Sequence, residues 1–220
     1  MSTVIGKIDI SDFSGDGLEI IGNDGFDRLF GTQSSELIDG RGGNDIIFGN
    51  GGSDLIIGGA GNDTIRAGAG DDSIIGSEGN DIILGEIGDD VVEAGSGNDT
   101  IFGDFGDDCI HGADGDDIIN GGAGSDTMLG GAGSDTMLGG AGADVFEFNI
   151  EDFAAGEADI VGDFRIGEDT IVIKGASEDD ITIDPTTNSI SINGGIITIG
   201  GAKVSSLEIE ENEDGDYEII

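Results

Sequence analysis

Residues 58–66 read GGAGNDTIR, one copy of a nine-residue pattern, G-G-x-G-x-D-x-U-x, in which U is apolar. Fourteen consecutive copies run in phase from Gly22 to Glu147. The sixth position is Asp in thirteen copies and Glu36 in the other, and the eighth position is apolar in all fourteen. The fourth position is Gly in thirteen copies and the first in twelve. A fixed short period of this kind indicates a solenoid, in which each repeat packs only on its neighbours.

Each copy is expected to supply one turn and one short strand. Positions 1–6 hold mostly Gly, Asn and Asp, which tolerate positive φ and tight turns, and positions 7–9 form a three-residue strand. Two successive copies then make one coil with a strand on each side. We therefore predict an all-β fold, a right-handed parallel β-roll (a β-helix solenoid) of about seven 18-residue coils with β-rich end caps. Its core would be a narrow seam of position-8 side chains, including Ile47, Ile56, Ile65, Ile74, Ile83, Val92, Ile101, Ile110 and Ile119.

The sequence divides into three segments. Residues 1–21 form an N-terminal cap, residues 22–147 the repeat array, and residues 148–220 a C-terminal β cap. Within the array, GGAGSDTML occurs twice in succession, at 121–129 and 130–138. The C-terminal cap alternates in β fashion at Asp169–Ile173, Ile181–Asp184, Ser189–Asn193, Ile196–Ile199 and Leu207–Ile209. We expect both caps to cover the open ends of the solenoid core.

The chain is strongly acidic. Its 220 residues include 48 Asp and Glu against 7 Lys and Arg, which gives a net charge of -41. A charge of this sign excludes nucleic acid as a partner and disfavours anionic membrane surfaces. It also makes the chain repel itself, although hydrophobic residues make up 36% of the chain and recur at a fixed spacing. We therefore expect the chain to become compact only when a cation neutralises the Asp residues.

The coil of two copies places the position-6 carboxylates of every second copy above one another, in a column along each edge of the roll. Carboxylates stacked at strand spacing repel strongly unless cations lie between them. Carboxylates and the carbonyls of Gly-rich turns form an all-oxygen ligand set, which suits Ca²⁺ better than Mg²⁺ or Zn²⁺. Seven turns on each edge leave six gaps, so about twelve Ca²⁺ sites are expected. The candidate ligands are the side chains of Asp27, Asp45, Asp54, Asp63, Asp72, Asp81, Asp90, Asp99, Asp108, Asp117, Asp126, Asp135 and Asp144 and the backbone carbonyls of Gly40, Gly42, Gly49, Gly51, Gly58, Ala60, Gly76, Gly121, Ala123, Gly130 and Ala132.

Over residues 22–147 the chain resembles the RTX proteins, the repeats-in-toxin or haemolysin-type calcium-binding proteins. The resemblance implies a parallel β-roll in which Asp side chains and turn carbonyls of successive coils share each ion. Residues 143–148 and 159–171 are similar to the C-terminal capping segment of that family. Its members leave Gram-negative cells through a type I exporter that reads an uncleaved C-terminal signal, and residues 216–220 resemble the tails of some members. Because residues 1–10 lack an apolar h-region, we expect no cleaved signal peptide and an extracellular, type I secreted protein.

Calcium should then control folding. Extracellular calcium modules bind with a Kd of roughly 10⁻⁴–10⁻³ M, and a site at about ten times its Kd adds about 1.4 kcal/mol of stability. Inside a cell this contribution vanishes while the charge repulsion remains. We therefore predict an unfolded chain in the cytosol and a folded roll outside.

Catalysis is not expected. His111 is the only His, it lies at an outward position, and no nucleophile with a partner base is visible. Cys109, also outward, is read as an inert or dimerising free thiol. The alternative function is a secreted effector that interacts with or permeabilises host membranes after Ca²⁺-induced folding, although no run approaches the length of a membrane span.

One outward column is unusually apolar. In every second copy, position 9 reads Phe30, Phe48, Arg66, Leu84, Phe102, Asn120 and Leu138, all on one face. Either the C-terminal segment covers it or the exposure is tolerated; the alternative is a self-association or partner face through Phe30, Phe48 and Phe102.

Overall fold

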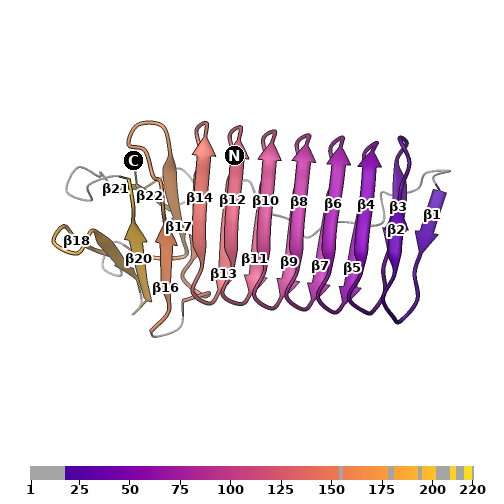
Figure 1. Ribbon diagram of the computed structural model, residues 1–220. Coiled ribbons are helices and arrows are strands. Elements are labelled where there is room, and N and C mark those ends of the chain that lie inside the picture. Colours follow the sequence, from indigo (N-terminus) through magenta and orange to yellow (C-terminus); the bar gives the residue numbers. More distant parts are fainter. Residues whose placement is uncertain are drawn as a thin grey trace.

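Two sheets of mainly parallel strands face each other along the molecule, with the core between them, and tight turns join them at both edges (Figure 1). The computed structural model describes residues 18–153, 156–177, 181–192, 195–201, 209–211 and 216–219, and no helix occurs among them. The chain alternates between the two sheets, so that odd-numbered strands of the array lie in one sheet and even-numbered strands in the other. The structure is thus the all-β parallel solenoid predicted from the repeats.

The first sheet has, in spatial order, β1 (Leu18–Ile21), β3 (Glu36–Asp39), β5 (Leu55–Ala60), β7 (Ser73–Glu78), β9 (Val91–Ser96), β11 (Cys109–Asp114), β13 (Thr127–Ala132), β15 (Val145–Asn149), β17 (Thr170–Lys174), β22 (Tyr217–Ile219) and β21 (Ile209–Glu211). The second sheet has β18 (Ile181–Asp184), β19 (Ser189–Ile192), β20 (Gly195–Ile199), β16 (Ala158–Val161), β14 (Thr136–Ala141), β12 (Ile118–Ala123), β10 (Thr100–Phe105), β8 (Ile82–Ile87), β6 (Thr64–Ala69), β4 (Ile46–Gly51) and β2 (Arg28–Phe30).

The strand register repeats the sequence period. Ile65 of β6 pairs with Ile83 of β8, and Ile83 pairs with Ile101 of β10, so that each partner lies two copies further along the chain. The strands are longer than the three residues expected, because pairing continues through positions 2 and 3 of the next copy, as Ala69 with Ile87. Most array strands therefore have six residues. The turns are correspondingly shorter, which brings the backbones of successive coils into close contact at each edge.

The turns require two left-handed backbone positions in each copy from residue 40 onward. Position 4 has positive φ and is Gly in each of these copies, as at Gly61 with φ 128°. Position 2 also has positive φ, but it is often not Gly, as at Glu86 and Ala113 with φ of 78° and 80°. An L residue in this region is strained by about 1–2 kcal/mol. Position 1, which is nearly always Gly, does not have positive φ, so its Gly has another cause.

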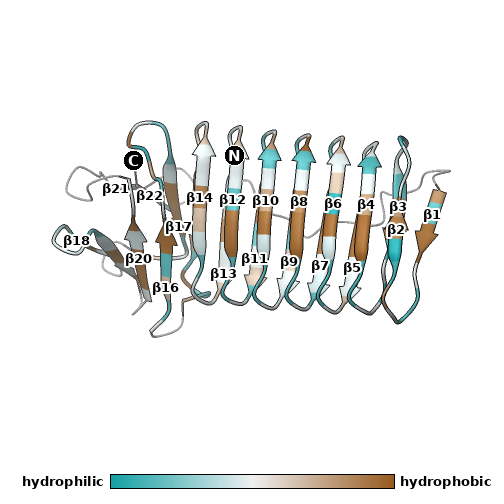
Figure 2. Ribbon diagram, in the orientation of Figure 1, coloured by the Kyte–Doolittle hydropathy of each residue, from teal (hydrophilic) through white to brown (hydrophobic). Residues whose placement is uncertain are grey.

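The core is the single seam of position-8 side chains. They are 0 or 1% exposed from Ile38 through Phe146, and Val161 of β16 and Ile171 of β17 continue the seam at 0%. Figure 2 shows hydrophobic residues in the central part of most strands and more polar residues at the turns. One inward apolar side chain per copy is a thin core for a domain of this length, so other interactions must hold the coils together.

The C-terminal segment extends the two sheets at one end of the array. β16 pairs in parallel with β14, and β17 with β15, so both sheets gain one further strand beyond the last repeat. β20 adds in parallel to β16, and β19 and β18 follow in antiparallel pairing. β22 pairs antiparallel with β17. Residues 1–17 of the expected N-terminal cap, the turn at 193–194, residues 207–208 of the last expected strand and residue 220 of the expected export signal lie outside the described residues.

Candidate metal centre

Position-6 carboxylates form one column along each edge of the roll, and each is tied to its neighbour by a hydrogen bond. The backbone nitrogen of Asp45 donates to Oδ1 of Asp63 at 2.7 Å, and that of Asp63 donates to Oδ1 of Asp81 at 2.7 Å. The same bond recurs along both edges at a separation of 18 residues. One oxygen of each carboxylate is therefore used to hold successive turns in register.

The second oxygen of these carboxylates is buried and has no hydrogen-bond partner. This holds for Oδ2 of Asp45, Asp54, Asp63, Asp72, Asp81, Asp90, Asp99, Asp108, Asp117, Asp126 and Asp135. All eleven residues are at most 2% exposed. A buried carboxylate oxygen without a partner costs several kcal/mol, and eleven in one small domain are far beyond what proteins tolerate unless a ligand satisfies them.

A turn carbonyl from the next coil faces each of several unpartnered oxygens. A Cβ atom on Gly40 would lie 2.6 Å from Oδ2 of Asp45 and 2.5 Å from the carbonyl oxygen of Gly58. One coil further, a Cβ atom on Gly58 would lie 2.6 Å from Oδ2 of Asp63 and 2.8 Å from the carbonyl oxygen of Gly76. Position 1 is therefore Gly because a carboxylate and a carbonyl converge there, and a methyl group would fill the space between them. Ala67 and Ala94 are the two exceptions.

The structure separates the predicted carbonyl ligands into two groups. The position-1 carbonyls of Gly40, Gly49, Gly58, Gly76, Gly121 and Gly130 all face the first residue of the preceding coil on the same edge, beside its carboxylate. The position-3 carbonyls of Ala60, Ala123 and Ala132 accept hydrogen bonds from the amides of Gly43, Gly106 and Gly115. A carbonyl oxygen has two lone pairs, so these three retain one for another partner. Gly42 and Gly51 occupy the same turn position in their own copies.

The first turn on each edge differs from the interior ones. Both oxygens of Asp27 accept hydrogen bonds from Asn23, whose backbone nitrogen lies 2.7 Å from Oδ2. Glu36 is held in the same way by the backbone nitrogen and hydroxyl of Thr32, at 2.8 and 2.6 Å. Asp27, although predicted as a ligand, thus has polar partners from its own turn. The backbone at position 2 differs as well, since Asn23 and Thr32 lack the positive φ of later copies, in which Asn50 has φ 72° and leaves Oδ2 of Asp54 unpartnered.

The columns continue beyond the repeats, which the sequence analysis did not anticipate. Asp159 accepts a hydrogen bond from the backbone nitrogen of Asp135 at 2.9 Å, and Asp169 accepts one from that of Asp144 at 3.2 Å. Both added carboxylates are buried. The sequence signal was the order acid, any residue, apolar residue, retained in D-I-V at 159–161 and D-T-I at 169–171 although the spacing is 24 and 25 residues.

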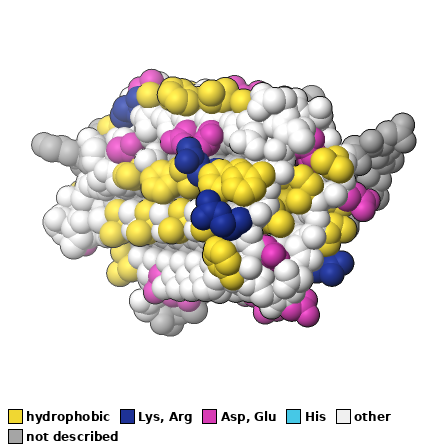
Figure 3. Space-filling view, turned by 45° about the vertical axis from the view of Figure 1, so that its right-hand side comes forward, with side chains coloured by type: hydrophobic (Ala, Val, Ile, Leu, Met, Phe, Trp, Pro, Cys, Tyr) yellow, Lys and Arg dark blue, Asp and Glu magenta, His cyan; other side chains and the backbone are white. Residues whose placement is uncertain are grey.

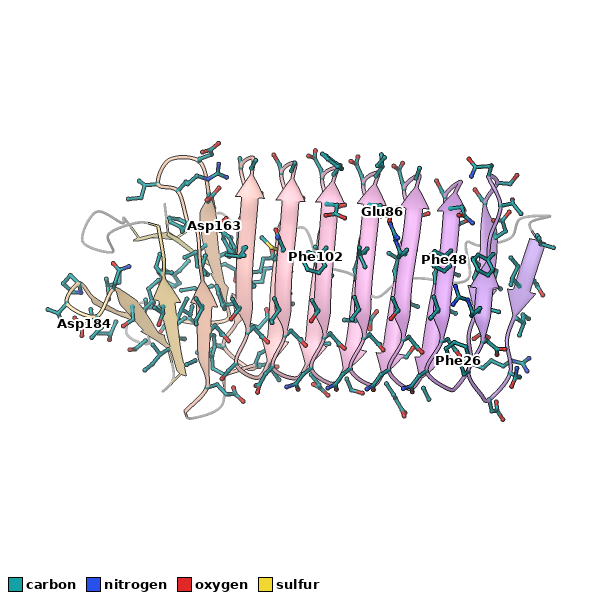
Figure 4. All side chains as sticks on the ribbon, in the orientation of Figure 1. Phe26, Phe48, Glu86, Phe102, Asp163 and Asp184 are labelled. Carbon is teal, nitrogen blue, oxygen red and sulfur yellow. The ribbon has the colours of Figure 1, made fainter. Side chains whose placement is uncertain are left out.

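Asp163 closes one strand end of the array. Its two carboxylate oxygens accept hydrogen bonds from the backbone nitrogens of Gly139 and Gly140, both at 2.9 Å. Figure 4 shows Asp163 near the end of the array, away from Glu86 on the longer run of strands. In interior coils the first of these amides donates to a backbone carbonyl, as Gly40 to Ile57, so Asp163 has a capping role.

Burial raises the pKa of most column carboxylates, so they ionise less readily than free Asp side chains. Desolvation is the largest cause, hydrogen bonds from the preceding turn oppose it, and neighbouring carboxylates mostly add to it. The pKa is raised to about 7 for Asp72, Asp81, Asp108, Asp117, Asp126 and Asp159 and to about 6 for Asp54, Asp63, Asp90 and Asp135. A cation that paired with these oxygens would reverse the shift.

The donor set fits a hard cation. Within the described ranges no group of three or more His, Cys, Asp or Glu side chains converges on one point. An ion between two turns would therefore take most of its ligands from backbone carbonyls and one or two from carboxylates, all of them oxygen. Ca²⁺ accepts such a flexible set of 6–8 oxygens, whereas Mg²⁺ demands a tight octahedron and Zn²⁺ prefers nitrogen and sulfur.

Other candidate residues lie on the outer faces. Burial lowers the pKa of His111 and raises that of the Cys109 thiol, which disfavours the reactive thiolate form of Cys109. Phe30 is 54% exposed and stacks on Phe48 with ring centroids 5.1 Å apart. Figure 3 shows hydrophobic side chains gathered in a band on one face, with Lys or Arg side chains within it. None of the described residues forms a helix that could cross a membrane.

The comparisons with known proteins agree with this geometry. The family model for the RTX calcium-binding nonapeptide repeat matches at residues 21–56, 48–83, 57–92, 84–119 and 111–146. These matches together cover residues 21–146, more than half of the 220 residues. No curated protein matches the chain. On the strength of the repeat matches, the buried Asp columns and the parallel solenoid, the chain belongs to the RTX calcium-binding nonapeptide repeat family.

Proposed function

We propose that the protein is a secreted, non-enzymatic calcium-binding protein whose β-roll folds when it binds several Ca²⁺ ions outside the cell. The observation that carries this proposal is the set of eleven buried, unpartnered Oδ2 atoms on the two Asp columns. No polar group of the described residues satisfies them, and they recur at every turn from Asp45 to Asp135. Ligands that occupy all eleven positions at once must be small, positively charged and abundant.

The geometry favours eleven ions over the twelve expected from gaps between turns. Each of the eleven carboxylates with a free oxygen would contribute to one ion, together with turn carbonyls of the same and the next coil. Asp27 and Glu36 are excluded because Asn23 and Thr32 already satisfy their carboxylates. Asp144 is excluded because its Oδ2 lies beside Arg165.

Calcium binding of this kind would control folding. At a free concentration about ten times Kd, each independent site stabilises the folded state by about 1.4 kcal/mol, so eleven sites contribute about 15 kcal/mol. Without ions the folded roll retains buried carboxylates in rows and only one core side chain per copy. A net charge of -41 adds repulsion across the whole chain. The calcium-free chain should therefore be unfolded.

The proposed location follows from the same energetics and from the family. Sites with a Kd near 10⁻⁴–10⁻³ M stay empty in the cytosol and fill outside the cell. An unfolded, calcium-free chain suits a type I exporter, and the family resemblance of the tail at 216–220 agrees with that route. Tyr217–Ile219 form β22 in the folded roll, so recognition by the exporter would precede folding.

Circular dichroism together with ion counting tests the proposal. In EGTA the spectrum should be that of an unfolded chain, and millimolar Ca²⁺ should induce β structure cooperatively, while equal Mg²⁺ should not. Native mass spectrometry of the folded form should count eleven bound ions. A full β spectrum in EGTA, or a folded protein that carries no calcium, would refute the proposal.

A further inference from the structure

Arg165 lies over the last turn of one Asp column. Its Nη2 atom donates a hydrogen bond to the carbonyl oxygen of Gly142 at 2.7 Å and lies 3.4 Å from both Asp144 Oδ2 and Asp169 Oδ1. Its backbone nitrogen donates to Asp169 Oδ2 at 2.7 Å. The Arg165 side chain is 37% exposed, whereas those of Asp144 and Asp169 are 0 and 1% exposed. The guanidinium thus caps two buried carboxylates from solvent.

These contacts match the environment proposed for an ion elsewhere in the column. Nη2 contacts carboxylates of two successive turns and the position-4 carbonyl of Gly142, so it meets carboxylate and turn-carbonyl oxygens as an ion would. In the interior the carbonyl beside Oδ2 is that of position 1. The Oδ2 atoms from Asp45 to Asp135 are buried without a partner, and the Oδ2 of Asp144 is not among them. Along this column the last unpartnered Oδ2 is that of Asp126, and the next carboxylate, Asp144, contacts the positively charged Arg165 side chain.

The opposite column ends without such a cation. Asp135 retains an unpartnered Oδ2 and donates its backbone amide to Asp159. In the described part of the chain, no ion pair reaches either residue. The two edges of the roll therefore end differently, although their repeats are alike.

We infer that the Arg165 guanidinium takes the place of the metal ion at the C-terminal end of the column that contains Asp144, an inference that rests on the proposed calcium binding. The guanidinium is always charged, and it is planar with five donors, which suits contacts to several oxygens at once. It is also tethered to the site, so its effective concentration is independent of the calcium concentration. The junction between the last coil and β17 on this edge is thereby closed without calcium.

The variant Arg165→Gln tests this assignment by ion counting. It removes the charge and leaves Oδ2 of Asp144 without its side-chain partner, as in the interior of the column, so native mass spectrometry in saturating Ca²⁺ should find one more bound ion per chain than in the wild type. Folding monitored by circular dichroism should then need a higher calcium concentration, because one further ion must bind. The matched control is Arg66→Gln, which removes an exposed Arg paired with Glu86 and should leave the ion count unchanged.

A second variant separates charge from packing. Arg165→Lys keeps the positive charge and should keep the wild-type ion count. An Arg165→Gln protein with the wild-type count, or an Arg165→Lys protein that gains an ion, would overturn the inference. So would an Arg165→Gln chain that remains unfolded in saturating calcium, since an ion should replace the guanidinium. A wild-type protein that binds no calcium would instead contradict the proposed function.

Discussion

Oδ1 of Asp99 accepts a hydrogen bond of 2.7 Å from the backbone nitrogen of Asp81, one coil earlier, while Oδ2 of each residue is buried and unpartnered. Each carboxylate therefore has two separate tasks. One oxygen holds the turns in register, and the other is left for a ligand. The proposed instability of the calcium-free roll would thus arise from the same residues that align its turns.

Replacing one column residue should lower calcium-dependent stability. Asp81→Asn retains the volume but removes the charge and one anionic ligand, so we expect one ion fewer per chain and a loss of about 1–3 kcal/mol of stability in Ca²⁺. Native mass spectrometry and urea unfolding in Ca²⁺ measure both effects. Asp114→Asn, at the exposed last residue of β11 and position 3 of its copy, removes the same charge away from the columns and should change neither. Equal effects of the two substitutions would contradict the assignment of position 6.

Low pH should partly substitute for calcium in stabilising the folded roll. Burial raises the pKa of Asp81 and Asp117 to about 7 in the folded state, above the ordinary value of 3.8. The folded form therefore binds more protons than the unfolded form between about pH 4 and 7, and protonation stabilises it as the pH falls through that window. In EGTA, circular dichroism should show more β structure at pH 5 than at pH 8.

The same linkage predicts how pH shifts calcium-induced folding. In the folded state protons and Ca²⁺ compete for the same carboxylates, whereas the unfolded chain keeps its carboxylates ionised between pH 6 and 8, so bound protons add to the stability of the folded form. The calcium concentration at the folding midpoint should therefore fall as the pH falls from 8 to 6. A midpoint that stays constant over this range would show that the folded roll takes up no protons at the column carboxylates.

Relief of backbone strain should stabilise the roll. Ala113 has φ 80° at position 2, so Ala113→Gly should raise the free energy of unfolding in Ca²⁺ by about 1 kcal/mol. Ala132→Gly is the control, since Ala132 ends β13 without positive φ, and this change should cost about 0.5–1 kcal/mol. Chemical unfolding in Ca²⁺ compares them, and the idea fails if both substitutions destabilise.

The aromatic column offers a test of association. If Phe48 and Phe102, which lie on the same face (Figure 4), belong to a self-association surface, the calcium-loaded wild type should scatter light as an oligomer. The double variant Phe48→Ser, Phe102→Ser should then be monomeric, with the same calcium-induced β spectrum. Monomers in both cases would leave these residues as tolerated surface side chains.

The repeat array was predictable because its determinants are local. A period of nine fixes the strand, the inward residue and the pairing of Ile65 with Ile83 without any long-range information. Sequence reasoning was less successful where the cause is contact between coils. It attributed the Gly-rich turn as a whole to positive φ, whereas Gly40 is required by the approach of Asp45 and Gly58.

The ends of the columns were also not predictable. Asp159 and Asp169 depart from the spacing of the repeats, so their place in the columns depends on how the intervening loops fold. The contact of Arg165 with Asp144 spans 21 residues outside any period. Asn23 and Thr32 resemble other turn residues in sequence, and only their hydrogen bonds distinguish the turns that they close.

The tandem duplication at 121–129 and 130–138 has a consequence for how such an array can change length. Its two identical copies contribute β13 and β14, which lie in opposite sheets. One additional copy would shift every later strand to the other sheet and carry Arg165, together with Asp144 and Asp169, to the opposite edge relative to the N-terminal turns. Two additional copies would restore every strand to its place and lengthen the rod by one coil. The number of added repeats therefore matters. An even number keeps the C-terminal cap on the same edges relative to the N-terminal turns, whereas an odd number moves it to the opposite edges.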